Sequence, residues 1–117
     1  MKVATNSFLP LAPATLHILL ALAGEDLHGY GIMQEVARQS EGRYRLGPGT
    51  LYDNLQRMMK LGLVEEVSGR PEDEGSRRRY YRLSSLGRGV LSAEILRLEG
   101  VVREARLHLK ALQPRKA

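Results

Sequence analysis

The sequence contains no cysteine and no long apolar run, and both absences exclude whole classes of protein. Without cysteine there is no disulfide framework, no thiol nucleophile and no cysteine-ligated zinc site. No apolar stretch approaches the roughly 18 residues of a membrane helix. The first ten residues lack the charged start and long apolar stretch of a signal peptide. The sequence therefore predicts a soluble cytoplasmic protein.

Catalytic and metal-binding patterns are also lacking. There is no Gly-x-Ser-x-Gly, His-Glu-x-x-His or phosphate-loop motif. The histidines His17, His28 and His108 are scattered, without a carboxylate cluster at ligand spacing. We expect His17 to be a packing residue, His28 to cap a turn at the start of a helix, and His108 to be solvated. The sequence predicts neither an enzyme nor a protein that holds a metal or cofactor.

The positive charge of the chain is concentrated in one stretch. Eighteen Lys and Arg against 13 Asp and Glu give a net charge of +5 over 117 residues, a length typical of one domain. The stretch 77–88 holds Arg77, Arg78, Arg79, Arg82 and Arg88 and no acid. Because the planar arginine fork suits phosphates and base edges, this stretch indicates an anionic partner.

The spacing of apolar and turn-forming residues predicts four helices and a hairpin. The predicted helices cover residues 13–23, 28–39, 47–61 and 85–112, and the predicted strands cover 63–67 and 79–83. This order is the plan of a winged helix-turn-helix followed by an extra helix, so the expected fold class is mainly α with a small β-hairpin. The expected parts are an N-terminal arm (1–11), a winged-helix DNA-binding domain (12–84), a dimerisation helix (85–112) and a tail (113–117).

The third predicted helix is the candidate for reading DNA. If its leucines face the core, the opposite face carries small hydrogen-bonding and charged groups. Asn54 would suit adenine, and Arg57 would suit guanine or a phosphate. The first turn, with Gly49 and Thr50, offers free backbone N–H groups to a phosphate. A helix face that is merely solvated would show the same pattern, and Asp53 would repel phosphates unless it accepts a hydrogen bond from a cytosine amine.

The predicted hairpin carries arginines on its return strand. Arg77, Arg78, Arg79 and Arg82 would allow this wing to lie along the DNA backbone and place an arginine in the minor groove. DNA would repel the loop-tip acids Glu72–Glu74, so we expect contact at the base of the strands. Alternatively, these acids pair with the arginines within the hairpin. The two interpretations are compatible, because DNA could displace the acids.

The last predicted helix has the most regular pattern in the chain. Its apolar residues recur at spacings of 4, 3, 4, 3, 4 and 3, an a/d seam over three heptads. At 1.5 Å per residue the helix would be about 42 Å long, more than the preceding domain can cover. A homodimer is therefore favoured, and packing back onto the chain's own first helix is the alternative. The seam consists of Leu91, Ile95, Leu98, Val102, Ala105, Leu109 and Leu112.

Three segments of the sequence carry a resemblance to known proteins. They are Leu27-His28-Gly29-Tyr30-Gly31-Ile32, then Gly49-Thr50-Leu51-Tyr52 running to Leu61-Gly62-Leu63-Val64-Glu65, then Arg79-Tyr80-Tyr81-Arg82-Leu83 with Leu86-Gly87. In this order and spacing they resemble the PadR family of bacterial transcriptional regulators, over roughly residues 11–91. The resemblance implies a winged-helix DNA-binding domain, a homodimer formed through the C-terminal helix, and repression by binding a palindromic promoter site.

The resemblance also implies roles for single residues. It places Thr50 and Tyr52 near the DNA backbone. Relatives commonly have a proline after that tyrosine, whereas this chain has Asp53, so Asp53 and Asn54 are expected to contribute to its own operator preference. Many relatives respond to a small effector, such as a phenolic acid or a drug, near the dimer interface. Residues 82–117 contain no Phe, Tyr or Trp, so the last helix lacks stacking surfaces for a flat aromatic effector.

The sequence therefore predicts a sequence-specific DNA-binding regulator that acts as a homodimeric repressor on an inverted-repeat promoter operator. Release by a small-molecule effector of unknown identity is compatible with this function. The alternative is a winged-helix protein-interaction module without specific DNA binding. The expected DNA-binding residues are Gly49, Thr50, Tyr52, Asp53, Asn54, Arg57, Arg77, Arg78 and Arg79.

Overall fold

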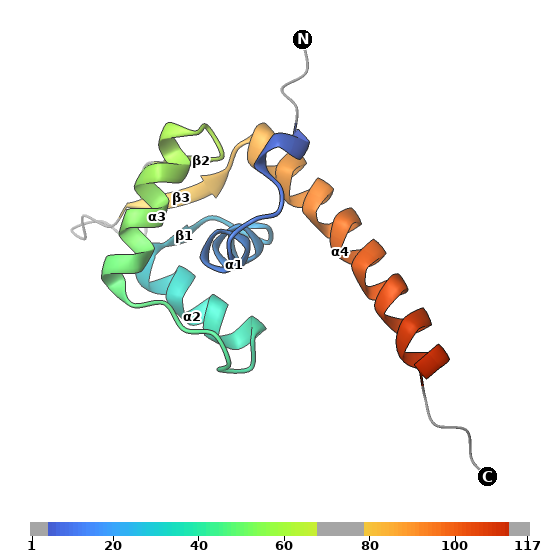
Figure 1. Cartoon of the computed structure of the whole chain (residues 1–117). Helices are drawn as coiled ribbons and strands as arrows, with labels where there is room; N and C mark the ends of the chain where they lie inside the picture. The colour runs from blue at the N-terminus through green and yellow to red at the C-terminus, as the bar shows by residue number, and fades with distance from the viewer. Residues whose placement is uncertain (1–4, 68–78, 113–117) are drawn as a thin grey trace.

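The structure, a computed structural model, describes residues 5–67 and 79–112, with the side chains of the last helix described as far as Lys110. Within these residues the elements are η1 (Thr5–Phe8), α1 (Pro13–Leu22), β1 (Leu27–His28), α2 (Gly29–Gln39), α3 (Pro48–Lys60), β2 (Val64–Val67), β3 (Tyr80–Leu83) and α4 (Ser85–Leu112). This is a mainly helical winged helix-turn-helix with a long last helix, and the predicted fold class is confirmed. Figure 1 shows α4 running out from the body formed by the other elements.

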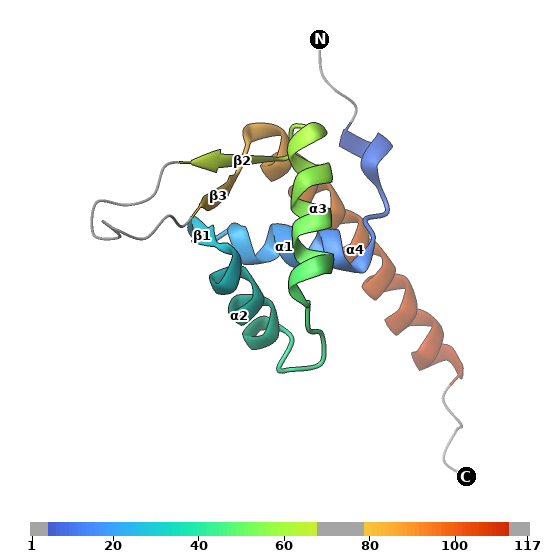
Figure 2. The same ribbon diagram turned by 90° about the vertical axis from the view of Figure 1, so that its left-hand side faces the viewer.

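Helix α1 lies at the centre of the fold. Its side chains Ile18, Leu19 and Leu22 are buried, and α1 contacts α2, α3, β3 and α4. In Figure 2 it passes behind α3, across the middle of the molecule. A helix that is apolar on nearly every face needs cover on all sides, and these neighbours supply it.

The sheet has one strand more than the predicted hairpin. Its three antiparallel strands lie in the order β1-β3-β2, so β3 is central. Leu27 pairs with Tyr81 and His28 pairs with Tyr80, on the side of β3 away from β2. The sequence predicted no strand at Leu27–His28, because two residues show no period and their partners lie far along the chain. Tyr80 and Tyr81 on this central strand are both buried, and β3 also contacts α1 and α4.

Two glycines mark the places where elements approach each other most closely. A Cβ atom on Gly87 would lie 2.0 Å from the carbonyl oxygen of Leu63, where α4 begins beside the wing. A Cβ atom on Gly29 would lie 2.2 Å from the Tyr52 hydroxyl oxygen, where α2 meets α3. Ser84 caps α4, because its Oγ accepts a hydrogen bond from the Gly87 N–H at 2.9 Å. The segments that carry the family resemblance therefore pack on one another.

Substitution of Gly87 by alanine is expected to lower the free energy of unfolding by about 1–3 kcal/mol, because the obstructing atom is a backbone oxygen that no rotamer change can move. Thermal unfolding followed by circular dichroism measures the change. The matched control is Gly100→Ala in the same helix, where an added Cβ has open space. The free energy of unfolding of this control is expected to rise by up to about 1 kcal/mol, because alanine has a higher helix propensity than glycine. Equal stability of the two variants would contradict the close packing at Gly87.

Candidate nucleic-acid interface

Helix α3 buries one side and exposes the other, as its spacing predicted. Leu51, Leu55 and Met58 are buried in the core. In Figure 2, α3 lies in front of α1 and α4. The exposed residues of α3 are Pro48, Gly49, Thr50, Tyr52, Asp53, Gln56, Arg57 and Lys60.

Asn54 does not share that exposed face. Its side chain is buried, and both of its polar groups are bonded within α3. Nδ2 donates to the Thr50 carbonyl oxygen at 2.8 Å, and Oδ1 accepts from Arg57 Nη2 at 2.7 Å. The helical spacing predicts Asn54 on the outer face, but the structure places it at the edge of the buried face. In this position Asn54 orients the Arg57 guanidinium.

The N-terminal end of α3 is open to a ligand. Gly47 is the N-cap residue and no side chain caps the helix. Pro48 occupies the first turn, and Gly49 and Thr50 are exposed. Free N–H groups in the first turn of a helix form a site for an anion such as a phosphate. Tyr52 is half-exposed, and its hydroxyl lies against Gly29 at the start of α2.

The described arginines of the wing have acid partners on the neighbouring strand. Arg79 Nε lies 3.6 Å from Glu66 Oε2, and Arg82 Nε donates to Glu65 Oε1 at 3.1 Å. All four side chains are exposed, and ion pairs at such surfaces contribute little to stability, so a phosphate can replace the carboxylate. The predicted contacts Arg77 and Arg78 and the loop-tip acids Glu72–Glu74 lie outside the described residues.

Helix α4 is buried at its start and exposed at its end. It contacts η1, α1 and β3, and Leu91, the first residue of the predicted seam, belongs to the chain's own core. A heptad pattern alone does not distinguish contact with the same chain from contact with a partner, so it predicts Leu91 in the dimer seam although Leu91 packs in its own chain. Every residue from 101 to 110 is exposed. Along the rest of the seam Leu98 is half-buried, Ile95, Val102, Ala105 and Leu109 are exposed, and the side chain of Leu112 lies outside the described residues.

A buried carboxylate attaches α4 to the N-terminal segment. Glu94 Oε2 accepts from the Leu11 N–H at 3.1 Å, and Arg97 donates to both carboxylate oxygens at 2.6 and 3.0 Å. The hydrogen bond from Arg97, supported by the Leu11 N–H, lowers the pKa of Glu94 below its ordinary value, although burial opposes this. The stabilisation from Glu94 is therefore complete above the pKa of an unfolded glutamate and is lost as the pH falls through the lowered folded pKa.

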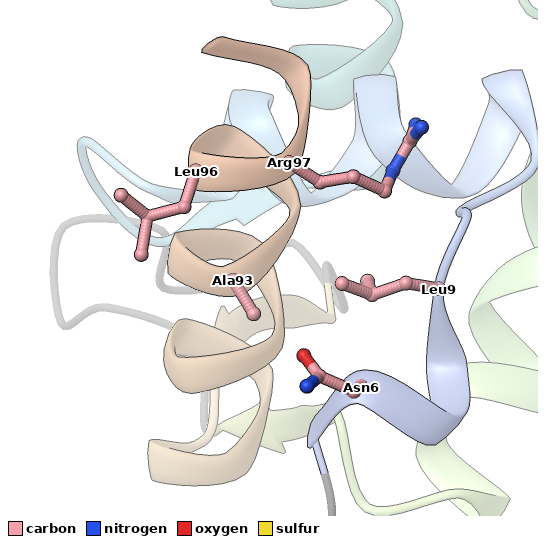
Figure 3. Close-up of a pocket in the computed structure, with 5 residues that line it drawn as sticks. All are labelled: Asn6, Leu9, Ala93, Leu96 and Arg97. Atoms are coloured by element: carbon pink, nitrogen blue, oxygen red, sulfur yellow. The ribbon is translucent and has the colours of Figure 1, made fainter. Parts of the chain in front are cut away.

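A pocket opens between η1 and α4 (Figure 3). It encloses about 470 Å³ and is lined by Asn6, Leu9, Ala93, Leu96 and Arg97. Because Arg97 is already paired with Glu94, the pocket offers an apolar wall and the Asn6 amide. None of its lining residues is aromatic, so a flat ring would find no stacking partner there.

The three histidines lie apart from one another in the structure, one as a helix cap, one in an aromatic stack and one exposed on α4. His28 Nδ1 accepts from the Gly31 N–H at 3.0 Å and so caps α2, as predicted. His17 stacks on Tyr44 with ring centroids 4.3 Å apart, and His108 is exposed on α4. Over residues 5–67 and 79–112, no group of three or more His, Asp or Glu residues is placed to hold a metal ion. No helix in the same part of the chain is long and apolar enough to cross a membrane.

Three exposed side chains beside α3 were not among the predicted site residues. Arg43 and Arg45 lie in the linker between α2 and α3, and Tyr30 lies in the first turn of α2 with 63% of its surface exposed. Two arginines just before a Gly-Pro-Gly helix start are a visible signal. Linker residues have no period, however, and nothing in the sequence shows which way they face.

Comparison with known proteins identifies the same fold and family. The Transcriptional regulator PadR-like family matches residues 18–93. A transcriptional regulator of Mycobacterium tuberculosis is 39% identical over 93 residues, which are 80% of this chain and 82% of that protein. A PadR family transcription regulator from Clostridium difficile superposes with a TM-score of 0.68 at 26% identity, covering 84% of this chain and 99% of that one. Bacillus subtilis PadR shares the fold, with a TM-score of 0.63 at 17% identity over 74% of this chain and 48% of that one.

Proposed function

Because this chain belongs to the PadR-like family of transcriptional regulators, we propose that it binds a specific operator as a homodimeric repressor. The observation that carries the proposal is the exposed face of α3, where hydrogen-bonding and cationic side chains adjoin an uncapped helix start. Bacillus subtilis PadR, which has the same fold, was crystallised with operator DNA. The proposed place of action is the cytoplasm, where bacterial DNA lies.

In this proposal α3 enters the major groove and its side chains have separate roles. Arg57 reads a guanine, because its fork matches the two acceptors of that base, and Asn54 holds the fork in place. Asp53 accepts from a cytosine amine, and Lys60 contacts a phosphate. Thr50 and the N–H groups of the first turn bind the DNA backbone. Tyr52 lies at the edge of the groove, and Arg77, Arg78 and Arg79 contact the backbone from the wing.

The exposed end of α4 supports the homodimer. Its apolar stripe has no cover within the described part of the chain. Glu99 and Arg106 flank the stripe at equivalent heptad positions, each following a d residue, and both are exposed. In an antiparallel pair of helices these positions face each other, so Glu99 would meet Arg106 of the partner subunit. In a parallel pair Glu99 would face Glu94 of the partner subunit and Arg106 would face Val101 of the partner subunit, so neither would meet an opposite charge and the charges favour the antiparallel arrangement.

The pocket between η1 and α4 is where we propose that an effector would bind. A ligand there would contact both elements, and a change in the angle of α4 would change the distance between the two α3 helices of the dimer. The aliphatic lining, with Leu9 and Leu96, suits a compact aliphatic molecule better than a flat aromatic one.

A binding assay separates this function from that of a protein-interaction module without specific DNA binding. A labelled duplex from the promoter upstream of the chain's own gene is titrated with the protein over a series of salt concentrations. We expect a random duplex to compete about a thousandfold less well or worse. We also expect log K to fall linearly with log salt, because phosphate contacts release counterions. Equal affinity for the two duplexes would contradict the proposed function.

A further inference from the structure

A groove of about 400 Å³ runs between α2 and the linker that leads into α3. Figure 1 shows this linker passing beside α2 before α3 begins. The groove offers three side chains with hydrogen-bond donors, the Tyr30 hydroxyl, the Gln34 amide and the Arg45 guanidinium, and no lining residue is an acid. Its lining is Tyr30, Met33, Gln34, Ala37, Arg45 and Leu46.

Arg45 brings an uncompensated charge to this groove. Its side chain is exposed, and in the range 5–67 and 79–112 no carboxylate pairs with it. Arg38, Arg79 and Arg82, by contrast, each have a glutamate partner. Arg45 Nη2 lies 3.4 Å from the place of a Cβ on Gly42, whose positive φ of 77° turns the linker here. The charge on Arg45 is therefore available to an external anion.

The groove lies beside the open end of α3. Leu46 directly precedes Gly47, the N-cap of α3. Tyr30 follows Gly29, which Tyr52 of α3 contacts. A helix in the major groove has a sugar–phosphate strand on each side. When the first turn of α3 meets the bases, the DNA strand on the α2 side would pass the groove between α2 and the linker.

We propose that the groove between α2 and the linker binds a backbone phosphate of DNA. Arg45 supplies the charge, and the Tyr30 hydroxyl and the Gln34 amide donate hydrogen bonds to the phosphate oxygens. This inference rests on the proposed function and deepens it, because backbone contacts fix the register and orientation of a protein on DNA. The contact carries no sequence information and acts on operator and random DNA alike.

Removal of the Arg45 charge tests the site. Arg45→Ala is expected to weaken binding to operator and random duplexes equally, by about tenfold at low salt. The slope of log K against log salt is negative, and its magnitude should decrease by about one for each phosphate contact that is lost. Tyr30→Phe removes one neutral donor, so it should weaken binding severalfold and leave the slope unchanged. The control is Arg103→Ala, which should change neither quantity. Arg103 is an exposed arginine on α4 that forms no ion pair with residues 5–67 or 79–112.

A phosphate scan identifies the partner atom. Methylphosphonate linkages, which are neutral, are placed one at a time along the duplex. We expect one position per half-site at which the wild type loses about tenfold and the Arg45→Ala variant loses nothing more. Two outcomes would overturn the groove as a phosphate site. In the first, the affinity losses from Arg45→Ala and from methylphosphonate add up at every position. In the second, Arg45→Ala keeps the affinity and the salt slope of the wild type. A different result would contradict the proposed function, namely that the wild-type protein binds its operator no more tightly than random DNA.

Discussion

Glutamate at both Leu98 and Val102 is expected to turn a dimer into a monomer and to weaken operator binding by about a hundredfold or more. Val102 is 46% exposed in the middle of the apolar stripe of α4, and Leu98 is half-buried one turn before it. Two carboxylates per subunit would face each other across a desolvated seam. A monomer also loses the gain in affinity from two linked recognition helices. Sedimentation velocity measures the first effect, and fluorescence anisotropy with the operator duplex measures the second.

The matched control places the same charges on the opposite side of α4. Leu96 and Leu107 are 70% and 58% exposed and lie about three helical turns apart on that side. Leu96→Glu with Leu107→Glu should leave the dimer intact. If the variant with glutamate at Leu98 and Val102 is still a dimer, the seam of α4 does not form the dimer interface. Circular dichroism of each variant establishes that α4 is still helical.

Charge reversal tests the direction of the two helices in the same sedimentation measurement. Glu99→Arg and Arg106→Glu should each weaken the dimer severalfold, because each places like charges opposite one another in an antiparallel pair. The combined variant restores opposite charges and should recover the wild-type association. No recovery would contradict the antiparallel arrangement.

Loss of the Arg57 side chain should lower the preference for operator over random DNA by about tenfold or more, since a bidentate contact to guanine discriminates by about 1–3 kcal/mol. Binding is measured on operators in which each base pair is replaced in turn. Arg57→Ala should make one base pair of each half-site tolerant of replacement. Lys60→Ala, on the same face of α3, is the control and should weaken binding to operator and random DNA equally.

The Asn54→Ala variant shows whether Asn54 acts through Arg57. Its Oδ1 holds the Arg57 guanidinium at 2.7 Å, and its side chain is buried. Asn54→Ala should therefore relax the same base pair as Arg57→Ala, by a smaller factor. Relaxation at a different base pair would show that Asn54 contacts DNA itself and would contradict the positioning role.

The helices of this fold could be predicted because their signals are local. Pro13 and Pro48 lie in the first turns of α1 and α3, Ser84 caps α4, and the apolar residues follow the helical period. The predicted bounds consequently agree with the structure to within about two residues. The close approaches at Gly29 and Gly87 are visible only in the structure, because the neighbouring atoms belong to Tyr52 and Leu63, which are distant in the sequence.

The remaining features depend on contacts between distant residues. Strand β1 exists because β3 has a second edge to pair. Asn54 is buried because its place on α3 lies at the boundary between two faces, where the period of a helix does not decide the side. Leu91 continues the heptad repeat and yet packs inside its own chain. The glutamate partners of Arg79 and Arg82 are set by strand register, Glu65 facing Arg82 across the β2–β3 pair.

A hydroxyl-radical footprint of the wild-type protein on its promoter tests the central claim, that a dimer places two α3 helices on one operator. We predict two protected segments related by inversion, with centres one helical turn, about 34 Å, or a multiple of it apart. A single protected half-site, or protection spread evenly along the duplex, would contradict this account.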